Sequence, residues 1–365
     1  MKILILESKL HHLRANIFDE NKDFPNCEIT YSGNRKYNQG RVYFSRYDLV
    51  VSTVFTSPTS DLIIEKCRNY GVKTLLLSDG IIEWENMYSN EFLAKKNIDL
   101  YLPIRHEYFG VMGSLESHYF NKINNSKSLR FTPNKVALDT NASLINEKSE
   151  KSEKVEMDFL LTSANRIYIN ESEKKIAFLI YIEIFSALNN MEVTFKTRIF
   201  DEDLLNEFRK INPDIINDID SSFEECIQSV SALLTGPSTI VFTAMQKNMP
   251  VAQILYRNTP VFTLTGWLIN SINDLENTLL SMLDPEKKRL AFQRAVLEDH
   301  QNNESIIDKI KPFSNEDKQY EIKEFYSSKY VINFEPLFRL VDDLIKVFLP
   351  KKIIKIWKKT ISKFK

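Results

Sequence analysis

Residues 229–261 constrain the fold of this chain more than any other stretch. An apolar run ends at Leu234, and the turn residues that follow it include Gly236. A helix is predicted to open at Ser238, and a second buried strand begins near Pro250. A strand, a turn, a helix and a strand in this order predict a parallel sheet with crossover helices, so we expect an α/β protein.

The turn after the first of these strands predicts an anion site. It consists of Gly236, Pro237, Ser238 and Thr239. Backbone N–H groups and the positive dipole end at a helix N-terminus attract anions, and two hydroxyls add donors for phosphate oxygens. The alternative is that Ser238 or Thr239 only caps the helix, because Ser and Thr are favoured caps.

The same alternation of strands and helices continues along the chain. Helices are predicted at 60–70 and 174–188. Further buried strands are predicted at 2–6, 47–51, 72–77, 98–102, 134–138, 158–161, 192–196 and 261–264. A chain of 365 residues is long for one hydrophobic core, so two domains are expected.

A change in composition marks the predicted domain boundary. The segment INEKSEKSEKVEM, at 145–157, is polar, rich in Lys and Glu, and without apolar periodicity. We therefore expect an N-terminal domain at 1–145, a linker at 146–157, a C-terminal domain at 158–345 and a terminal helix at 346–365.

Carboxylates follow the strand predicted at 72–77. Asp79 lies in a Ser-Asp-Gly turn directly after that strand, and Glu83 and Glu85 come next. Ligands of open α/β sheets bind beyond the carboxyl ends of strands, so Asp79 is the candidate general base, with Glu83 and Glu85 in reserve. The alternative is a plain turn, because Asp-Gly is a common turn dipeptide.

Histidines follow the first predicted strand. His11 is a candidate acid or phosphate partner, together with its neighbour His12. The alternative is that both are ordinary surface residues.

Two cations, Lys196 and Arg198, are expected at the carboxyl end of the strand at 192–196. There they suit a phosphate or a carboxylate, and the alternative is solvated surface charge. Thr162 and Ser163 follow the strand at 158–161 in the same way and join the ligand-binding candidates. The acidic cluster that begins at Asp201 predicts a helix N-terminus and not a metal site.

Residues 351–365, KKIIKIWKKTISKFK, predict a basic amphipathic helix. Ile353, Ile356, Trp357 and Ile361 recur at helical spacing, and lysines occupy most of the other face. Such a helix suits an anionic membrane surface. The alternative is a terminal helix that docks on its own domain.

Charge and hydropathy exclude several classes of protein. The net charge of −1 provides no basic field to steer a nucleic acid. No apolar run is long enough to span a membrane, and the run at 3–6 is too short for a secretory signal. The sequence therefore predicts a cytoplasmic protein, peripheral on the inner face of the cell membrane, that binds no nucleic acid.

The motifs together resemble those of bacterial GT-B glycosyltransferases. Many members carry a glycine or serine turn, paired hydroxyls, a helix and a Pro-Val step, and residues 236–239 and 250–251 match that pattern. In the capsule and lipopolysaccharide branch, which includes sialyltransferase-like and Kdo-transferase-like members, an upstream strand usually ends in Lys-Pro-His-Pro. Here Lys196 is kept and the histidine is absent. The acidic-Asp-Gly motif of the first domain has a weaker counterpart at 78–80.

The resemblance implies two Rossmann-like domains and glycosyl transfer from a nucleotide-activated donor to a cell-surface glycan or lipid-linked acceptor. It implies no cofactor and no metal. The turn at 236–239 would hold the donor phosphate, Lys196 or Arg198 would neutralise the leaving nucleotide, and Asp79 would deprotonate the acceptor hydroxyl.

The nature of the donor depends on one departure from the family pattern. Many UDP-sugar enzymes of this architecture place a ribose-binding glutamate where Thr243 stands, so a CMP-linked acidic sugar is slightly favoured over a UDP-sugar. The alternatives are a nucleotide-sugar epimerase of the same architecture and a non-catalytic, membrane-associated assembly protein.

Overall fold

The computed structural model describes residues 1–55, 57–94, 100–101, 103–124, 126–137, 157–163 and 170–310. The chain separates into two compact units. The first comprises Met1–Leu77, Arg105–Phe109 and the chain from Ser305, and the second comprises Ser78–Ile104 and Gly110–Glu304. The linker predicted at 146–157 (apart from Met157) and the helix predicted at 346–365 lie outside the described residues, so the domain boundaries proposed from the sequence remain predictions.

The first sheet has six strands in the order β2-β1-β3-β4-β5-β6. Its strands are β1 (Lys2–Ile5), β2 (Glu28–Thr30), β3 (Leu49–Ser52), β4 (Lys73–Leu77), β5 (Tyr108–Val111) and β6 (Lys127–Arg130). Strand β1 pairs in parallel with both β2 and β3, and β3 pairs in parallel with β4. Strand β2, which follows β1 in the chain, lies on one side of β1, and the next strand, β3, lies on its other side. The sheet therefore has a topological switch point between β1 and β3.

The second sheet has five strands in the order β11-β10-β9-β7-β8. Its strands are β7 (Met157–Thr162), β8 (Phe195–Arg198), β9 (Val230–Thr235), β10 (Val251–Ile254) and β11 (Trp267–Ile269). All of its strand pairs are parallel. Strand β8, which follows β7 in the chain, lies on one side of β7, and the next strand, β9, lies on its other side. The switch point of this sheet is therefore between β7 and β9.

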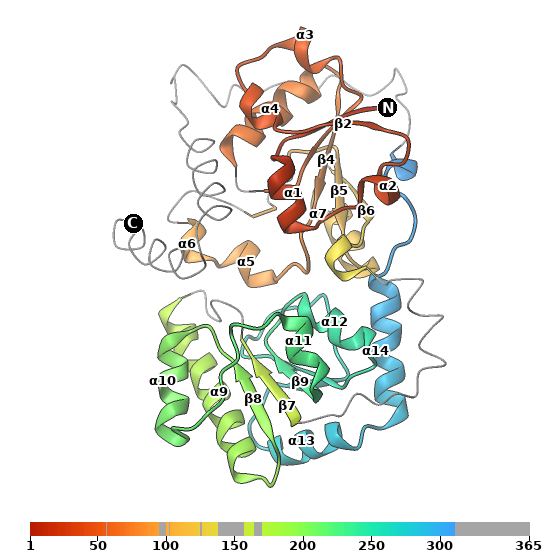
Figure 1. Cartoon of the computed structure of the whole chain (residues 1–365). Helices are drawn as coiled ribbons and strands as arrows, with labels where there is room; N and C mark the ends of the chain where they lie inside the picture. The colour runs from red at the N-terminus through yellow and green to blue at the C-terminus, as the bar shows by residue number, and fades with distance from the viewer. Residues whose placement is uncertain are drawn as a thin grey trace. The chain divides into compact units, whose positions relative to one another are not determined.

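The remaining elements are helices and short 3-10 turns (Figure 1). In the first unit they are α1 (Lys9–Ala15), α2 (Glu20–Asp23), η1 (Gly33–Lys36), α3 (Arg41–Phe44), α4 (Pro58–Asn69) and η3 (Ile307–Lys309). In the second unit they are α5 (Trp84–Tyr88), α6 (Glu91–Ala94), α7 (Ser114–Ile123), η2 (Asn134–Val136), α9 (Glu171–Asn190), α10 (Glu202–Ile211), α11 (Phe223–Gln228), α12 (Ile240–Gln246), α13 (Leu275–Leu283) and α14 (Lys287–His300).

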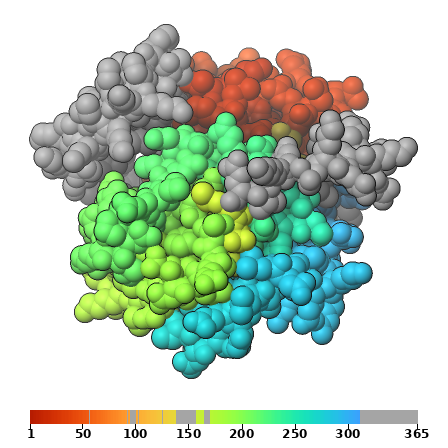
Figure 2. Space-filling model, turned by 60° about the horizontal axis from the view of Figure 1, so that its bottom comes forward, coloured from red at the N-terminus to blue at the C-terminus, as the bar shows by residue number. Residues whose placement is uncertain are grey.

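Both faces of the second sheet are covered, because its strands are apolar on both sides. In β9, Ala232 and Leu234 pack with residues of α9, α10 and α13, whereas Leu233 packs with residues of α11, α12 and α14. Helices α10 and α14 lie at opposite sides of this unit (Figures 1 and 2). This two-sided burial is the physical basis of the doubly wound arrangement.

Helix α9 has a period that places one face on the sheet. Its buried residues include Ala177, Tyr181, Ile184 and Leu188, which recur every three or four positions. The helix begins at Asn170, whose side chain accepts a hydrogen bond from the Glu173 N–H. The same period fixes Tyr181 on the buried face of the helix.

Most of the predicted α/β elements are confirmed. The strands predicted at 2–6, 47–51, 72–77, 158–161 and 192–196, and the two within 229–261, correspond to β1, β3, β4, β7, β8, β9 and β10 with shifted ends. The helices predicted at 60–70 and 174–188 correspond to α4 and α9. Together these elements confirm the α/β fold class.

Two strand predictions do not match the structure, and a third lies mostly outside the described residues. The segment at 134–138 begins with the 3-10 turn η2, in which Val136 packs against the α12 layer and not in a sheet. The strand predicted at 261–264 is wrong, since that segment is a loop and the edge strand β11 follows it at Trp267–Ile269. Of the strand predicted at 98–102, only residues 100 and 101 are described, and they form a turn.

None of the helices in the described residues combines the length and apolar character that a membrane-spanning helix needs.

Candidate functional site

The predicted phosphate turn lies at the switch point of the second sheet. Thr162 at the end of β7 is the register partner of Thr235 at the end of β9. The buried phenol of Tyr181 joins these two strand ends, because its oxygen accepts from the Gly236 N–H at 3.1 Å and donates to the Thr162 carbonyl at 3.2 Å. The structure therefore brings together Thr162 and Gly236, which lie 74 positions apart in the sequence.

The two hydroxyls of the turn have different surroundings. Thr239 makes no side-chain cap on α12, and its Oγ1 instead accepts from the Ile81 N–H at 3.3 Å. A Cβ on Gly80 would lie 2.1 Å from that Oγ1, so a side chain at this position would require Thr239 to shift. The Ser238 hydroxyl has no hydrogen-bond partner among the described residues. Capping by Thr239 is therefore wrong, and Ser238 offers a hydroxyl to a ligand.

A buried carboxyl group forms a hydrogen bond with the loop after β4. The Ile82 N–H donates to Glu116 Oε1 at 3.4 Å, and Glu116 itself is fully buried in the first turn of α7. Burial raises the pKa of Glu116 well above its ordinary value. Asp79 lies in the same loop with its side chain exposed to solvent.

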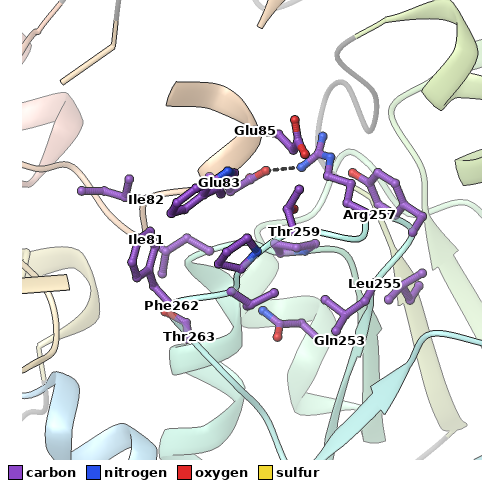
Figure 3. Close-up of a pocket in the computed structure, with 16 residues that line it drawn as sticks. Ile81, Ile82, Glu83, Glu85, Gln253, Leu255, Arg257, Thr259, Phe262 and Thr263 are labelled. Atoms are coloured by element: carbon purple, nitrogen blue, oxygen red, sulfur yellow. Dashed lines mark hydrogen bonds and ion pairs between the residues drawn. The ribbon is translucent and has the colours of Figure 1, made fainter. Parts of the chain in front are cut away.

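A pocket lies beside this loop within the second unit (Figure 3). It is lined by residues 81–85, by Pro237 and by residues 253–257 and 259–263. The pocket holds about 460 Å³ of empty space, including the solvent at its mouth. Glu83 and Glu85 belong to its lining, whereas Asp79 does not.

Arg257 links the pocket lining to α9 through two carboxylates. Its Nη1 lies 2.5 Å from Glu83 Oε2, and its Nε is paired with Glu173 Oε1 (Figure 3 shows the pair with Glu83). Burial raises the pKa of Glu83, and the guanidinium of Arg257 partly opposes this effect. Burial alone would lower the pKa of Arg257, but the two carboxylates raise it. Glu83 is thus engaged in an ion pair, while Glu85 has no ion-pair partner among the described residues.

The two predicted cations have partners in the structure. Lys196 is buried, donates to Ser229 Oγ at 3.1 Å and lies 3.6 Å from Asp218 Oδ2. Arg198 donates to the Asp218 carbonyl at 2.7 Å and covers the ring of Phe200. Only Arg198 is the last residue of its strand. Lys196 lies two positions deeper in the sheet, so Arg198 is the cation nearer to the ligand edge.

Thr162 and Ser163 lie between Arg198 and the turn. Thr162 Oγ1 donates to the Arg198 carbonyl at 3.1 Å, and Ser163 Oγ accepts from the Phe200 N–H at 3.4 Å. Both hydroxyls therefore join the end of β7 to the end of β8.

Two other predicted features lie away from this group in the chain. His11 is in the first turn of α1 in the first unit, where its N–H donates to the cap residue Ser8. Its neighbour His12 is buried and stacks on Phe18 with ring centroids 4.0 Å apart, so the surface alternative is wrong for His12. Asp201 caps α10 by accepting from the Asp203 and Leu204 N–H groups, as predicted.

Sequence reasoning missed four residues of this region. They are Glu116, Tyr181, Gln253 and Arg257. Tyr181 and Gln253 lie within predicted apolar elements, where a polar group in an otherwise apolar stretch is the available signal. Arg257 lies three positions after the end of β10, the second strand of the 229–261 unit, so the rule that applies to strand ends would have found it.

The comparisons with known proteins define the fold. No protein-family model matches the sequence, and no curated protein matches it. A putative UDP-N-acetylglucosamine 2-epimerase from Listeria monocytogenes superposes with a TM-score of 0.51 at 11% identity, over 83% of this chain and 92% of that one. UDP-GlcNAc 2-epimerase from Neisseria meningitidis, bound to UDP-GlcNAc, gives 0.50 at 9% identity, over 84% and 96%.

A lipopolysaccharide outer core galactosyltransferase in its apo form gives a TM-score of 0.48 at 14% identity, over 83% of this chain and 96% of that one. The structure and the two likenesses at 0.50 and above confirm an α/β fold with two parallel Rossmann-like sheets, the GT-B architecture.

Proposed function

We propose that this protein is a glycosyltransferase that moves a sugar from a nucleotide-activated donor to a glycan or lipid-linked acceptor. The observation that carries the proposal is the position of the Gly236–Thr239 turn at the β7–β9 switch point. Ligands of open α/β sheets bind at such points. The Ser238 hydroxyl there has no hydrogen-bond partner in the described part of the chain, and it suits a phosphate oxygen of the donor.

The leaving nucleotide would extend from this turn toward β8. Thr235, Thr162 and Arg198 are register partners on three adjacent strands, so they lie in one row across the sheet. Two strand spacings place the ends of that row roughly 10 Å apart. Arg198 is therefore the preferred cation to neutralise the leaving phosphate. Lys196 pairs with the carboxylate of Asp218, whose backbone carbonyl accepts a hydrogen bond from Arg198.

The acceptor hydroxyl needs a general base near the donor carbon. The loop after β4 supplies two candidates: Asp79, which is exposed, and Glu85, which lines the pocket. We favour Glu85 because Glu83 is engaged by Arg257 and Asp79 is outside the lining. In this proposal the protein's own cations neutralise the leaving group, so turnover should not change when divalent metals are chelated.

The charge of the pocket bears on the donor sugar. Its charged lining residues are Glu83, Glu85 and Arg257, and Arg257 is further paired with Glu173. This excess of carboxylates would repel an acidic sugar, so nothing in the site supports the CMP-linked acidic donor predicted from the sequence. We propose an uncharged sugar instead.

The acceptor side depends on residues 351–365, which lie outside the described residues. We propose that this basic segment brings the enzyme to an anionic membrane that carries the acceptor. Deletion of 351–365 should abolish cosedimentation with liposomes that contain anionic lipid and leave nucleotide binding unchanged. Equal cosedimentation of the two proteins would contradict the membrane proposal.

A thermal-shift screen with CMP, UDP, GDP and CDP tests the donor site. A nucleotide at about 100 times its Kd stabilises the folded state by about 2.7 kcal/mol, which is a visible shift in Tm. The screen should single out one nucleotide, and Ser238→Ala should weaken its effect. No shift with any nucleotide would favour the non-catalytic assembly protein.

A nucleotide-sugar epimerase is the second candidate. The specific observation in its favour is that the two structures at TM-scores of 0.51 and 0.50 are, by their titles, UDP-GlcNAc 2-epimerases. An epimerase acts on the donor alone, whereas a transferase needs an acceptor. Incubation with UDP-GlcNAc and no acceptor distinguishes them, because only an epimerase would form a second nucleotide sugar.

A further inference from the structure

Residues 33–47 of the first unit carry a concentrated positive charge. The segment contains Arg35, Lys36, Arg41 and Arg46 and no Asp or Glu, so its formal charge is +4, whereas that of the whole chain is −1. All four residues are exposed to solvent. Surface charges of both signs are usually interspersed, so a run of exposed cations without carboxylates points to an anionic partner.

This charge is not cancelled by the surrounding residues. None of the four cations has an ion-pair partner in the part of the chain that the structure describes. The nearby carboxylates of α4, Asp61 and Glu65, are both paired with Arg105. Asp48 directly follows the segment, and a charge of +3 is left when it is included. The segment therefore presents a positive surface.

The four cations belong to one continuous stretch of surface over α4. Both η1, which ends at Lys36, and α3, which begins at Arg41, contact α4. Figure 1 shows α3 beside α4. The loop between η1 and α3 is fastened to α4, because Lys66 Nζ donates to the carbonyls of Tyr37 at 2.6 Å and Gln39 at 3.3 Å. The packing on α4 keeps the two pairs of cations together.

Apolar and aromatic groups lie among these cations. Val42, in α3, is 89% exposed and directly follows Arg41. Tyr43 and Tyr47 are half-buried and pack against the core, and the guanidinium carbon of Arg46 lies 4.6 Å from the centre of the Tyr43 ring. Tyrosines suit the boundary between lipid and water, and cations there interact with anionic headgroups.

We propose that residues 33–47, the basic surface, bind an anionic lipid membrane. The four cations would contact lipid phosphates, and Val42 would enter the boundary between headgroups and acyl chains. A nucleic-acid backbone would engage the cations but offers no apolar layer for Val42. The inference goes beyond the proposed function, because this surface belongs to the first unit and depends neither on the donor site nor on residues 351–365.

The first test measures cosedimentation of the full-length protein with phosphatidylcholine liposomes that contain phosphatidylglycerol. Each Lys or Arg near an anionic membrane strengthens binding about fivefold. Replacement of Arg35, Lys36, Arg41 and Arg46 together by Gln should therefore weaken binding roughly 10²- to 10³-fold. The loss should be measurable with residues 351–365 present, because separate membrane contacts contribute additively to the binding free energy.

A matched control removes the same charge from another part of the protein. Lys122, Lys175, Lys247 and Lys287 are exposed and belong to the second unit. Their joint replacement by Gln should change liposome binding by less than about threefold, since salt screens distant surface charges. An equal loss in both variants would assign the effect to overall charge and overturn the proposal, as would wild-type binding by the first variant.

The second test uses Val42→Trp as a probe of membrane insertion. The indole should show an emission shift to shorter wavelength on anionic liposomes, and lipids with brominated acyl chains should quench it. Leu280→Trp is the control, because Leu280 is 53% exposed on α13 of the second unit, and it should show neither change. Absence of quenching in Val42→Trp would contradict insertion at the basic surface.

The remaining outcomes separate a membrane from other anionic partners and from the donor site. If the four Gln replacements weaken binding to a single-stranded oligonucleotide or to an acidic polypeptide but not to liposomes, the surface binds that polymer and the proposal is overturned. The same variant should keep the wild-type Tm and any nucleotide-induced rise in Tm. Failure of every nucleotide to bind would contradict the transferase and leave the liposome result unaffected.

Discussion

The two parallel sheets each have a switch point, but different groups occupy the two places. At the β1–β3 point of the first sheet, the buried carboxylate of Glu7 accepts from the Thr53 N–H at 3.1 Å and the Val54 N–H at 3.3 Å. At the β7–β9 point of the second sheet, the phenol of Tyr181 accepts from the Gly236 N–H at 3.1 Å. One sheet places a carboxylate on its loop amides, and the other places an uncharged hydroxyl there.

This difference determines which of the two switch points can bind a phosphate. The Glu7 carboxylate already fills the position that an anion would take on the Thr53 and Val54 amides, and it would repel a second anion. Burial raises the pKa of Tyr181, so its phenol stays neutral at physiological pH. The second switch point therefore remains compatible with an anionic ligand. Four substitutions test this difference between the two switch points.

The largest effect is expected for Glu85→Gln, which tests whether chemistry belongs to the pocket beside the second switch point. Loss of a general base typically reduces kcat by about 10²- to 10⁴-fold, so this variant should bind the donor normally and lose most turnover. Asp79→Asn is the matched control and should retain most of its activity. Steady-state kinetics of both variants, measured with the donor that the nucleotide screen identifies, distinguish Glu85 from Asp79 as the base. If Asp79→Asn carries the loss instead, the base is the residue that the sequence predicts.

Gly80→Ala should give the next largest effect, because its new Cβ would overlap Thr239 Oγ1. Relief of such a contact requires shifts that cost about 2–3 kcal/mol of unfolding free energy. Urea unfolding of Gly80→Ala, Thr239→Ala and the double variant measures the coupling. The double variant should lose less stability than the sum of the two single variants. Simple additivity would show that the loop and the turn do not touch.

Glu7→Gln tests the first switch point. The substitution removes the charge and presents an NH2 group to one of two backbone N–H donors, so we expect a loss of about 1–2 kcal/mol of unfolding free energy. The nucleotide-induced rise in Tm should equal that of the wild type, since the proposed donor site belongs to the other sheet. A reduced rise would place the nucleotide at the first switch point.

Tyr181→Phe gives the smallest effect and the sharpest contrast with Glu7→Gln. Removal of the hydroxyl leaves the Gly236 N–H without its partner and costs about 0.5–1.5 kcal/mol in the ligand-free protein. A bound phosphate could then accept from that N–H, so the nucleotide-induced rise in Tm should exceed that of the wild type. An unchanged rise would show that the phosphate does not reach Gly236.

The elements that the sequence predicts well are those with a local signal. Strands β1, β3, β4, β7, β9 and β10 are mostly apolar runs between turn residues, which is the pattern of strands buried on both faces. Strands β2 and β6, EIT and KSLR, were missed because they are short and carry few apolar residues. They form strands because the neighbouring strands supply their hydrogen-bond partners.

The candidate site also contains some features with a local sequence signal and others without one. The turn at Gly236 was recognisable because glycine, proline and hydroxyl residues after an apolar run have a local meaning. The engagement of Lys196 by Asp218 and of Thr239 by the Ile81 N–H was not, since each joins residues from distant parts of the chain.

The α/β alternation and the turn that follows β9 could be predicted from the sequence, because both follow from local periodicity and turn chemistry. Which polar groups already have hydrogen-bond partners became visible only in the folded structure. It paired Arg257 with Glu83 and Glu173, placed Tyr181 on Gly236 and left Gln253 without a partner in the described chain. Whether a polar group is buried and hydrogen-bonded depends on which distant segments contact each other in the fold. Local periodicity along the chain carries no information about those contacts.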